Sequence, residues 1–217
     1  MIKKQVLRRK IREIFRHSID VENRLRLKNK DFTIISSNCI GGIIYHDLKM
    51  PFLSPTINLY MNTKDFIKFC SNMKYYLDQE LIEVLEKEYN YPVAKCVDLK
   101  LYGVHYRNFH ELNDKWHERA GRINWNNIYV MLAERDDCGI NDIKQFDKLE
   151  IKNKVIFVHQ EMPHIKSAVY IPGSLDDEGE RTCVADLTTY KGRFTGERLI
   201  DKFDYVEFFN SGLLKLR

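Results

Sequence analysis

The chain has 217 residues, of which 44% are hydrophobic and 30% charged. A chain of this length and composition can bury the core of one large globular domain or two small ones. It has no run of about 18 apolar residues, as a transmembrane helix requires. The first residues lack the apolar segment of a secretory signal, so we expect a cytoplasmic protein.

The cysteines indicate reduced thiols. Five are present, at positions 39, 70, 96, 138 and 183. Their number is odd, and no two have the Cys-x-x-Cys spacing that is typical of zinc sites and redox motifs. This distribution excludes a regular disulfide framework and is typical of proteins from a reducing compartment.

The net charge of +4 is unevenly distributed along the chain. Residues 1–30 carry a net charge of +8, whereas residues 31–217 carry −4. Residues 2–28 have the apolar spacing of an amphipathic helix. We therefore predict a basic amino-terminal helix (residues 1–30) followed by a single α/β domain (residues 31–217).

This charge distribution indicates which partners to expect. The apolar stripe of the helix is expected to dock on the body of the protein or on a second copy. The basic residues are either a solvated helix face or a site for an anionic membrane surface, which would place the protein at the inner face of the membrane. Nucleic acid is excluded as a partner because the body is acidic and lacks a basic stripe with interleaved aromatic residues. The oligomeric state is left open.

Further along the chain, apolar strands are predicted to alternate with helices. Buried strands are typified by short β-branched runs, and helices by apolar residues three or four positions apart. In chain order we expect a strand at 32–37, a helix at 40–48, extended chain at 51–61, a helix at 62–77, a short helix at 79–88, one strand or a bent pair at 93–104, a helix from 108, a strand at 127–133, a helix at 141–149, strands at 154–159 and 168–171, irregular chain at 172–202 and a helix at 203–210.

The alternation of these elements predicts the fold class. At least three of the strands are apolar on both faces, as in sheets that are covered on both sides. The chain is therefore expected to be an α/β protein. Its sheet should be mixed or mostly parallel, with helices on both faces.

The junction between the first strand and the first helix of this domain is the most informative stretch. Ser36, Ser37 and Asn38 are helix-capping residue types, so Cys39 should lie where the strand meets the helix amino terminus. A thiol at this place can lose its proton and act as a nucleophile. Gly41 and Gly42, in the first helical turn, suggest the close approach of a ligand or another backbone. The alternative is a structural cysteine buried in a tight junction.

A histidine at the end of another strand supplies the partner that a nucleophilic cysteine requires. His105 follows the apolar residues 99–104, and ligands of open α/β sheets bind beyond the carboxyl ends of strands. Cys39 and His105 would form a nucleophile and base. Asp98, Glu134 and Asp136 are candidates to orient the imidazole. A hydrogen-bonded structural histidine is the alternative interpretation.

Acidic and basic groups elsewhere permit a different chemistry. Glu134 and Asp136 follow the strand at 127–133 and could hold Mg²⁺ or Mn²⁺ against a diphosphate. Arg119, Arg122 and Asn124 could bind phosphate or carboxylate, because the guanidinium group suits both anions. Alternatively, the acids form a polar turn, and at least one arginine pairs internally with an acid at 134–137.

Four long motifs stand out in the chain: SNCIGGIIYHDL, FLSPTINLYMNTKDFIKF, YPVAKCVDLKLYGVHYRNFHELNDKWHERAGRIN and NIYVMLAERDDC. They resemble a bacterial domain family of unknown function whose members are commonly labelled exopolysaccharide or capsular polysaccharide biosynthesis proteins. The resemblance runs from about Phe32 to Phe157, with a weaker match at FDYVEFFN. It implies an α/β fold and a role in surface polysaccharide, but no established reaction. The chain departs from the pattern at Ser37-Asn38, where two asparagines are usual, and at Ala133-Glu134, where Thr-Asp is usual.

Three hypotheses follow. The first is a transferase that modifies a glycan through Cys39 as nucleophile and His105 as base, with Asn38, Gly41, Gly42 and the 119–124 segment binding substrate. The second is a metal-dependent glycosyltransferase that uses Glu134 and Asp136 and binds an activated sugar. The third is a non-catalytic assembly protein that attaches through its basic helix. The sequence names no cofactor.

Overall fold

The central feature of the computed structural model is a parallel β-sheet. The structure describes residues 2–135, 137–176, 183–192 and 194–217. Within them the main sheet has the strand order β1-β5-β6-β7, and every neighbouring pair is parallel. Its strands are β1 (Thr33–Ser36), β5 (Ile128–Ala133), β6 (Asn153–Val158) and β7 (Ala168–Tyr170). The predicted α/β class with a mostly parallel sheet is therefore confirmed.

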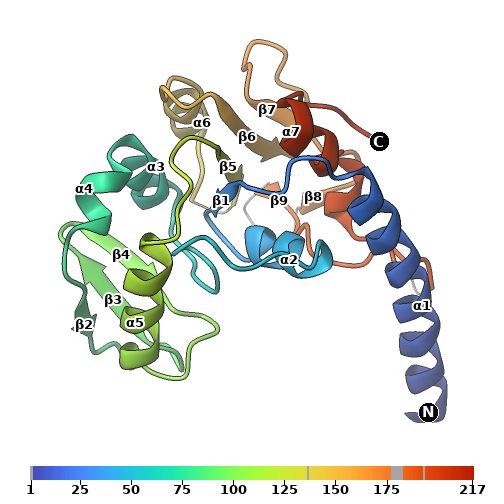
Figure 1. Ribbon diagram of the computed structural model, residues 1–217, viewed down its shortest axis with the longest axis horizontal. Coiled ribbons are helices and arrows are strands. Elements are labelled where there is room, and N and C mark those ends of the chain that lie inside the picture. The colour runs from blue at the N-terminus through green and yellow to red at the C-terminus, as the bar shows by residue number, and fades with distance from the viewer. Residues whose placement is uncertain (1, 136, 177–182, 193) are drawn as a thin grey trace.

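Helices cover both faces of this sheet (Figure 1). One face packs against α3 (Thr63–Ser71), α5 (Phe109–Ala120) and α6 (Ile140–Asp147), and the other against α2 (Ile40–Asp47) and α7 (Tyr205–Ser211). Successive strand residues point to opposite faces, so each strand contributes to both cores. Ile35, Val130 and Ile156 lie in the first core, and Ile34, Met131 and Phe157 lie in the second.

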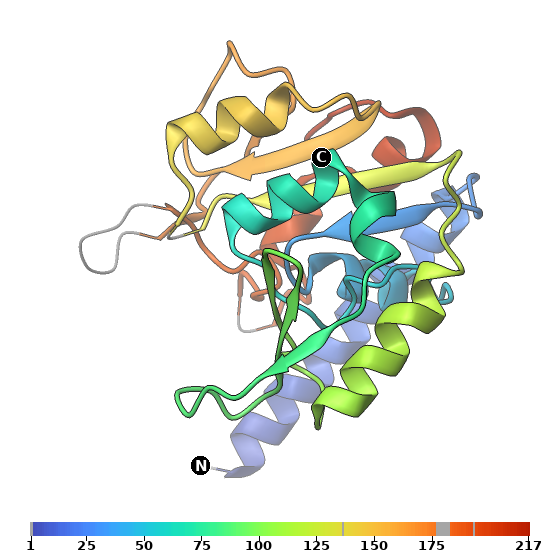
Figure 2. The ribbon, with the colours of Figure 1, turned by 90° about the vertical axis from the view of Figure 1, so that its left-hand side faces the viewer.

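A smaller antiparallel sheet lies beside the main one (Figures 1 and 2). It consists of β2 (Ile82–Val84), β3 (Val93–Cys96) and β4 (Leu99–Tyr102), in that spatial order. The short helix α4 (Met73–Leu77) precedes it in the chain. This sheet and α5 form an insertion between β1 and β5, the two adjacent strands of the main sheet.

The sequence predicted most of these elements, and the differences have local causes. The helix expected at 79–88 is wrong, because residues 82–84 form strand β2 on the edge of the small sheet. The helix expected at 62–77 is divided at Asn72, which has non-helical backbone angles. Residues 93–104 form the hairpin β3–β4, with Val97 in the left-handed region at φ 56°.

The carboxyl-terminal part contains short elements within the irregular chain that the sequence predicted. These are β8 (Leu175–Asp176), β9 (Cys183–Val184) and the 3₁₀ helix η1 (Leu199–Lys202). The final helix begins at Tyr205, where Asp204 accepts a hydrogen bond from the amide of Glu207. Phe208 and Phe209 of this helix are fully buried, so it packs back on the sheet as predicted.

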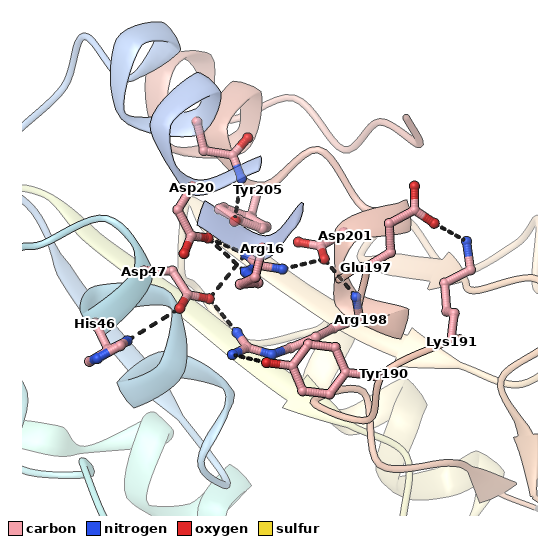
Figure 3. A network of polar contacts seen from close by, with 11 residues as sticks. Arg16, Asp20, His46, Asp47, Tyr190, Lys191, Glu197, Arg198, Asp201 and Tyr205 are labelled. Carbon is pink, nitrogen blue, oxygen red and sulfur yellow. Dashed lines mark hydrogen bonds and ion pairs between the residues drawn. The ribbon is translucent and has the colours of Figure 1, made fainter. Parts of the chain in front are cut away.

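The amino-terminal helix α1 (Ile2–Arg26) is attached to the body by a buried ionic cluster (Figure 3). Its centre is the guanidinium group of Arg16, which lies 2.6 Å from Asp20, 3.1 Å from Asp47 and 2.5 Å from Asp201. Arg198 pairs with Asp47 as well. Arg16, Asp47 and Asp201 are each less than one-tenth exposed. The cluster therefore joins α1, α2 and η1 through charges removed from water.

In the described part of the chain, no helix has both the length and the apolar character to cross a membrane. The cytoplasmic location and the division at residue 30 remain predictions.

Replacement of Arg16 tests the importance of the buried cluster. Arg16→Met should lower the free energy of unfolding by about 3 kcal/mol or more, because it leaves buried carboxylates without their cation. The measurement is urea denaturation followed by circular dichroism. Lys115→Met is the matched control: Lys115 pairs with Glu118 on the surface, so its loss should cost less than about 1 kcal/mol. Equal effects of the two substitutions would contradict this role of Arg16.

Candidate functional site

Cys39 lies at the junction that the sequence indicated, directly before the first turn of α2. The first amide groups of the helix are occupied by other side chains. The Asn38 side chain accepts from the N–H of Ile40 at 3.1 Å, and Ser36 Oγ accepts from the N–H of Gly41 at 3.2 Å. The thiol makes no capping bond. Its sulfur is therefore left to interact with groups across the junction.

A short segment before α3 brings the small sheet to this junction. The amide of Met61 donates to the carbonyl of Ser37, at the end of β1, over 3.0 Å. The adjacent residue Tyr60 exchanges two backbone hydrogen bonds of 2.9 Å with Tyr102, the last residue of β4. The turn that follows β4 is thereby held next to the end of β1, and this turn carries His105.

The turn is also supported from behind. Tyr106 is buried, and its hydroxyl donates to the carbonyl of Ile57 over 2.8 Å. Arg119, from α5, donates to the same hydroxyl over 2.8 Å. Gly103 packs so closely on Leu112 that an added Cβ atom would lie 2.5 Å from its side chain. These contacts fix the backbone on both sides of His105.

Cys39 and His105 meet across the junction. The sulfur of Cys39 lies 3.2 Å from Nε2 of His105, which is hydrogen-bond distance for a thiol. When Nδ1 carries the ring proton, the thiol donates to Nε2. The imidazole is then placed to accept the thiol proton during nucleophilic attack. The structure thus brings together the two residues that the sequence paired, which are 66 positions apart.

The pair opens into a cleft of about 520 Å³. This volume is within the range of about 300–1,000 Å³ for small-molecule sites. Beyond Cys39 and His105, its polar lining includes Asn38, Tyr60, Arg135, Asp186 and Thr188. The cleft lies beyond the carboxyl ends of β1 and β5, where ligands of open α/β sheets bind.

Electrostatics favours the neutral thiol in the resting protein. Burial raises the pKa of Cys39, and the negative charge of Asp186 raises it further. A raised pKa means that less thiolate is present at neutral pH. The arrangement therefore suits general-base activation, in which His105 removes the proton as the sulfur attacks, better than a preformed thiolate.

Two residues of the cleft, Asp186 and Arg135, were not selected as site residues from the sequence. Asp186 accepts hydrogen bonds from the amide and hydroxyl of Thr188, at 2.9 and 2.7 Å. Arg135 donates to the carbonyl of Val184 over 3.2 Å. The sequence signal for this stretch was the apolar pair Val184 and Leu187 among polar residues, and both side chains are buried in the structure.

Asp98 was predicted to be a catalytic residue that orients His105, but the structure places it elsewhere. It lies in the β3–β4 turn, whereas His105 follows the opposite end of β4. Its carboxylate accepts from Lys68 at 3.0 Å and from the hydroxyl of Tyr76 at 3.1 Å. These contacts, the one with Lys68 foremost, lower the pKa of Asp98. The predicted triad is therefore not assembled.

The segment predicted to bind substrate also lies away from the cleft. Arg119 is buried behind the His105 turn, and Arg122 pairs with Glu118 on the surface. The amide of Asn124 donates to Thr33 over 2.9 Å, at the amino end of β1 and opposite to Cys39. Helix α5 thus fills a structural role, because Arg119 donates to internal acceptors, the Tyr106 hydroxyl and the Ile57 carbonyl.

The two glycines of α2 differ in their surroundings. A Cβ atom on Gly41 would lie 2.6 Å from Ser36 Oγ and 3.1 Å from Ile34. On Gly42 the nearest neighbour, Ile57, would be at an ordinary 3.5 Å. Gly41 therefore permits close packing of α2 on β1. At position 42 the surrounding space would also accept the side chain of alanine.

Glu134, the described residue of the acidic pair predicted after β5, is engaged with a histidine. Glu134 is buried, and its carboxylate accepts a hydrogen bond from the backbone amide of His159 over 3.0 Å. Nδ1 of the His159 ring lies 2.7 Å from the same carboxylate oxygen. Asp136 lies outside the described residues. Among the residues that are described, no group of three or more His, Cys, Asp or Glu side chains could hold a metal ion.

The fold and site define an α/β protein with a thiol–imidazole pair at the carboxyl edge of a parallel sheet. A family model described as "Domain of unknown function (DUF1919)" matches residues 10–210, and the chain belongs to this family. An uncharacterized protein of Haemophilus influenzae is 41% identical over 185 residues, which cover 85% of this chain and 87% of that protein. The predicted unknown-function family is thus confirmed; the polysaccharide label remains a prediction.

The contrast between the glycines can be tested by two single substitutions. Gly41→Ala should reduce the free energy of unfolding by about 1–3 kcal/mol, because Ser36 is buried and must move. Gly42→Ala should be neutral or stabilising by up to about 1 kcal/mol, since alanine is the better helix former. Thermal denaturation of both variants measures the difference, and similar losses in both would refute the packing argument.

The electrostatic argument predicts the pH dependence of alkylation at Cys39. Because the thiol pKa is raised, the iodoacetamide reaction should have its midpoint above the usual value of about 8.5. Asp186→Asn removes a negative charge and should move the midpoint to lower pH, whereas Asp78→Asn, at the exposed end of α4, should not. Peptide mass spectrometry follows the modification of Cys39. A wild-type midpoint near neutral pH would indicate a preformed thiolate instead.

Proposed function

We propose that this protein is a thiol-dependent acyltransferase that modifies a bacterial surface glycan. The observation that carries the proposal is the 3.2 Å contact between Cys39 and His105 at the mouth of a cleft. A buried structural cysteine would need neither an imidazole partner nor access from solvent. The cleft also provides room for a donor and an acceptor group.

The reaction would proceed by double displacement. The sulfur of Cys39 attacks the carbonyl carbon of an activated acyl donor, such as a thioester, while His105 accepts the thiol proton. The resulting imidazolium returns this proton to the leaving thiol, and an acyl-cysteine is formed. A sugar hydroxyl then attacks the acyl-cysteine, His105 accepts the hydroxyl proton, and the departing sulfur regains it.

Other residues of the cleft fit roles in this reaction. Asn38 can donate from its side-chain amide to the oxygen that becomes negative during attack. Arg135 suits an anionic part of the donor or acceptor, because guanidinium groups bind phosphate and carboxylate. Asp186 raises the pKa of the resting thiol, which leaves its proton in place until the donor arrives.

The two parts of the proposal have different support. The thiol chemistry comes from the geometry of the cleft, and the glycan acceptor comes from the resemblance of the sequence motifs to polysaccharide biosynthesis proteins. We do not extend the proposal to a metal-dependent glycosyltransferase. Glu134 is engaged with His159, and neither Arg119 nor Arg122 lies in the cleft.

The acyl-enzyme step can be tested directly with an activated ester. Incubation with p-nitrophenyl acetate should add one acetyl group to Cys39, detected by peptide mass spectrometry. Cys39→Ala should abolish this adduct, and His105→Asn should slow its formation by about 10²-fold or more, a typical contribution of a general base. Cys138→Ala, which removes another half-buried thiol, is the control and should acylate normally.

Two results would contradict the proposal. One is acylation of Cys39 at the same rate with and without His105, which would show a merely accessible thiol. The other concerns the acceptor: a folded Cys39→Ala variant that leaves the acyl content of the strain's surface polysaccharide unchanged would rule out this glycan role.

A further inference from the structure

The outer face of α1 presents a stripe of large apolar side chains to solvent. Leu7, Ile14 and Val21 follow one another at intervals of seven residues, and Leu25 continues the same line. Ile14 is 67% and Leu25 is 81% exposed. Phe15, which is also exposed, widens the stripe on one side. Exposed large apolar side chains gathered on one face in this way are a common mark of an interaction site.

The opposite face of the helix is fixed to the body. Arg16, Asn23 and Leu27 point inward and are buried. The loop around Gly196 approaches so closely that a Cβ atom there would lie 2.5 Å from the backbone nitrogen of Arg16. Asn23 donates to the hydroxyl of Tyr205 over 2.6 Å. The apolar stripe is therefore held facing away from the body, and the amino-terminal part of α1 projects beyond it (Figure 1).

Basic residues border the stripe. Lys10 and His17 are exposed along one edge. Asp20 pairs with the buried Arg16 on the side of α1 nearer to the body, and Glu22 pairs with Arg217.

We propose that this stripe, defined by Leu7, Ile14, Phe15, Val21 and Leu25, lies in the interface of an anionic lipid membrane. An amphipathic helix with apolar residues bordered by Lys and Arg binds such a surface by burying the apolar side chains while its cations attract the lipid headgroups. The proposal concerns the attachment of the protein and does not depend on chemistry at Cys39.

Charge argues against a second copy of the chain as the occupant. The sequence of residues 1–30 carries a net charge of +8, which stays positive when Arg16 and Arg26 are left out because they pair with carboxylates of the body, so two such helices side by side would repel each other. A membrane leaflet rich in anionic lipid offers charge of the opposite sign together with an apolar layer, and it satisfies both features of the helix.

The test is sedimentation of the full chain with lipid vesicles at low and physiological salt. Wild-type protein should bind vesicles of phosphatidylglycerol and phosphatidylcholine, and bind vesicles of phosphatidylcholine alone far more weakly. The double variant Ile14→Ser, Leu25→Ser should bind the anionic vesicles at least about tenfold more weakly, because two buried apolar side chains are lost. Lys10→Glu should weaken binding several-fold.

Matched controls come from the small sheet. Ile82 and Leu85 are 65% and 89% exposed, so Ile82→Ser, Leu85→Ser changes the same residue types at similar exposure. This variant should bind as wild type does, as should Lys87→Glu. All the substituted residues are exposed, and circular dichroism checks that each variant is folded.

Several outcomes would overturn the proposal. One is a wild-type chain that fails to bind anionic vesicles or binds both kinds equally. Another is a double variant that binds as tightly as wild type. A third is a dimer, measured by sedimentation equilibrium, that the double variant abolishes without affecting vesicle binding; this would identify a second copy as the occupant.

Discussion

The architecture of the site depends on one short segment that is hydrogen-bonded to both sheets. Met61 holds the end of β1, while its neighbour Tyr60 pairs with Tyr102 at the end of β4. Neither Cys39 nor His105 could meet the other through its own sheet alone, because the small sheet is an insertion and shares no strand with the main one. Tyr60 and Met61 thus hold the ends of β1 and β4 next to each other, so that residues following both strands line one cleft.

Sequence reasoning succeeded where the chemistry is local and failed where it depends on tertiary contacts. Cys39 could be placed because strand and helix signals meet at that residue, and His105 because it follows an apolar strand. Asp98 was misassigned because the sequence did not show that residues 93–104 reverse direction at Val97, which moves Asp98 to the far end of the hairpin. The role of Arg119 could not be predicted, since its acceptors lie elsewhere in the sequence.

The same limit applies to the electrostatics of the thiol. A cysteine beside a helix amino terminus suggests a lowered pKa, but the first helical amides are already occupied by Asn38 and Ser36. Burial and the charge of Asp186, contributed by a stretch that the sequence marked only as irregular, have the opposite effect. Reactivity at this site would consequently depend on proton transfer to the neighbouring imidazole rather than on the resting charge of sulfur.

The position of the insertion also has a consequence for synthesis on the ribosome. Among the described strands, β1 pairs with β5 alone, in a register that sets Thr33 opposite Ile128. At a translation rate of about 5–20 residues per second, the first strand waits on the order of ten seconds for its partner. During this interval the unpaired backbone of β1, whose residues are mostly β-branched, is open to pairing with other chains. Early closure of the inserted hairpin and α5 would shorten the effective separation of the two strands and limit aggregation of the nascent protein.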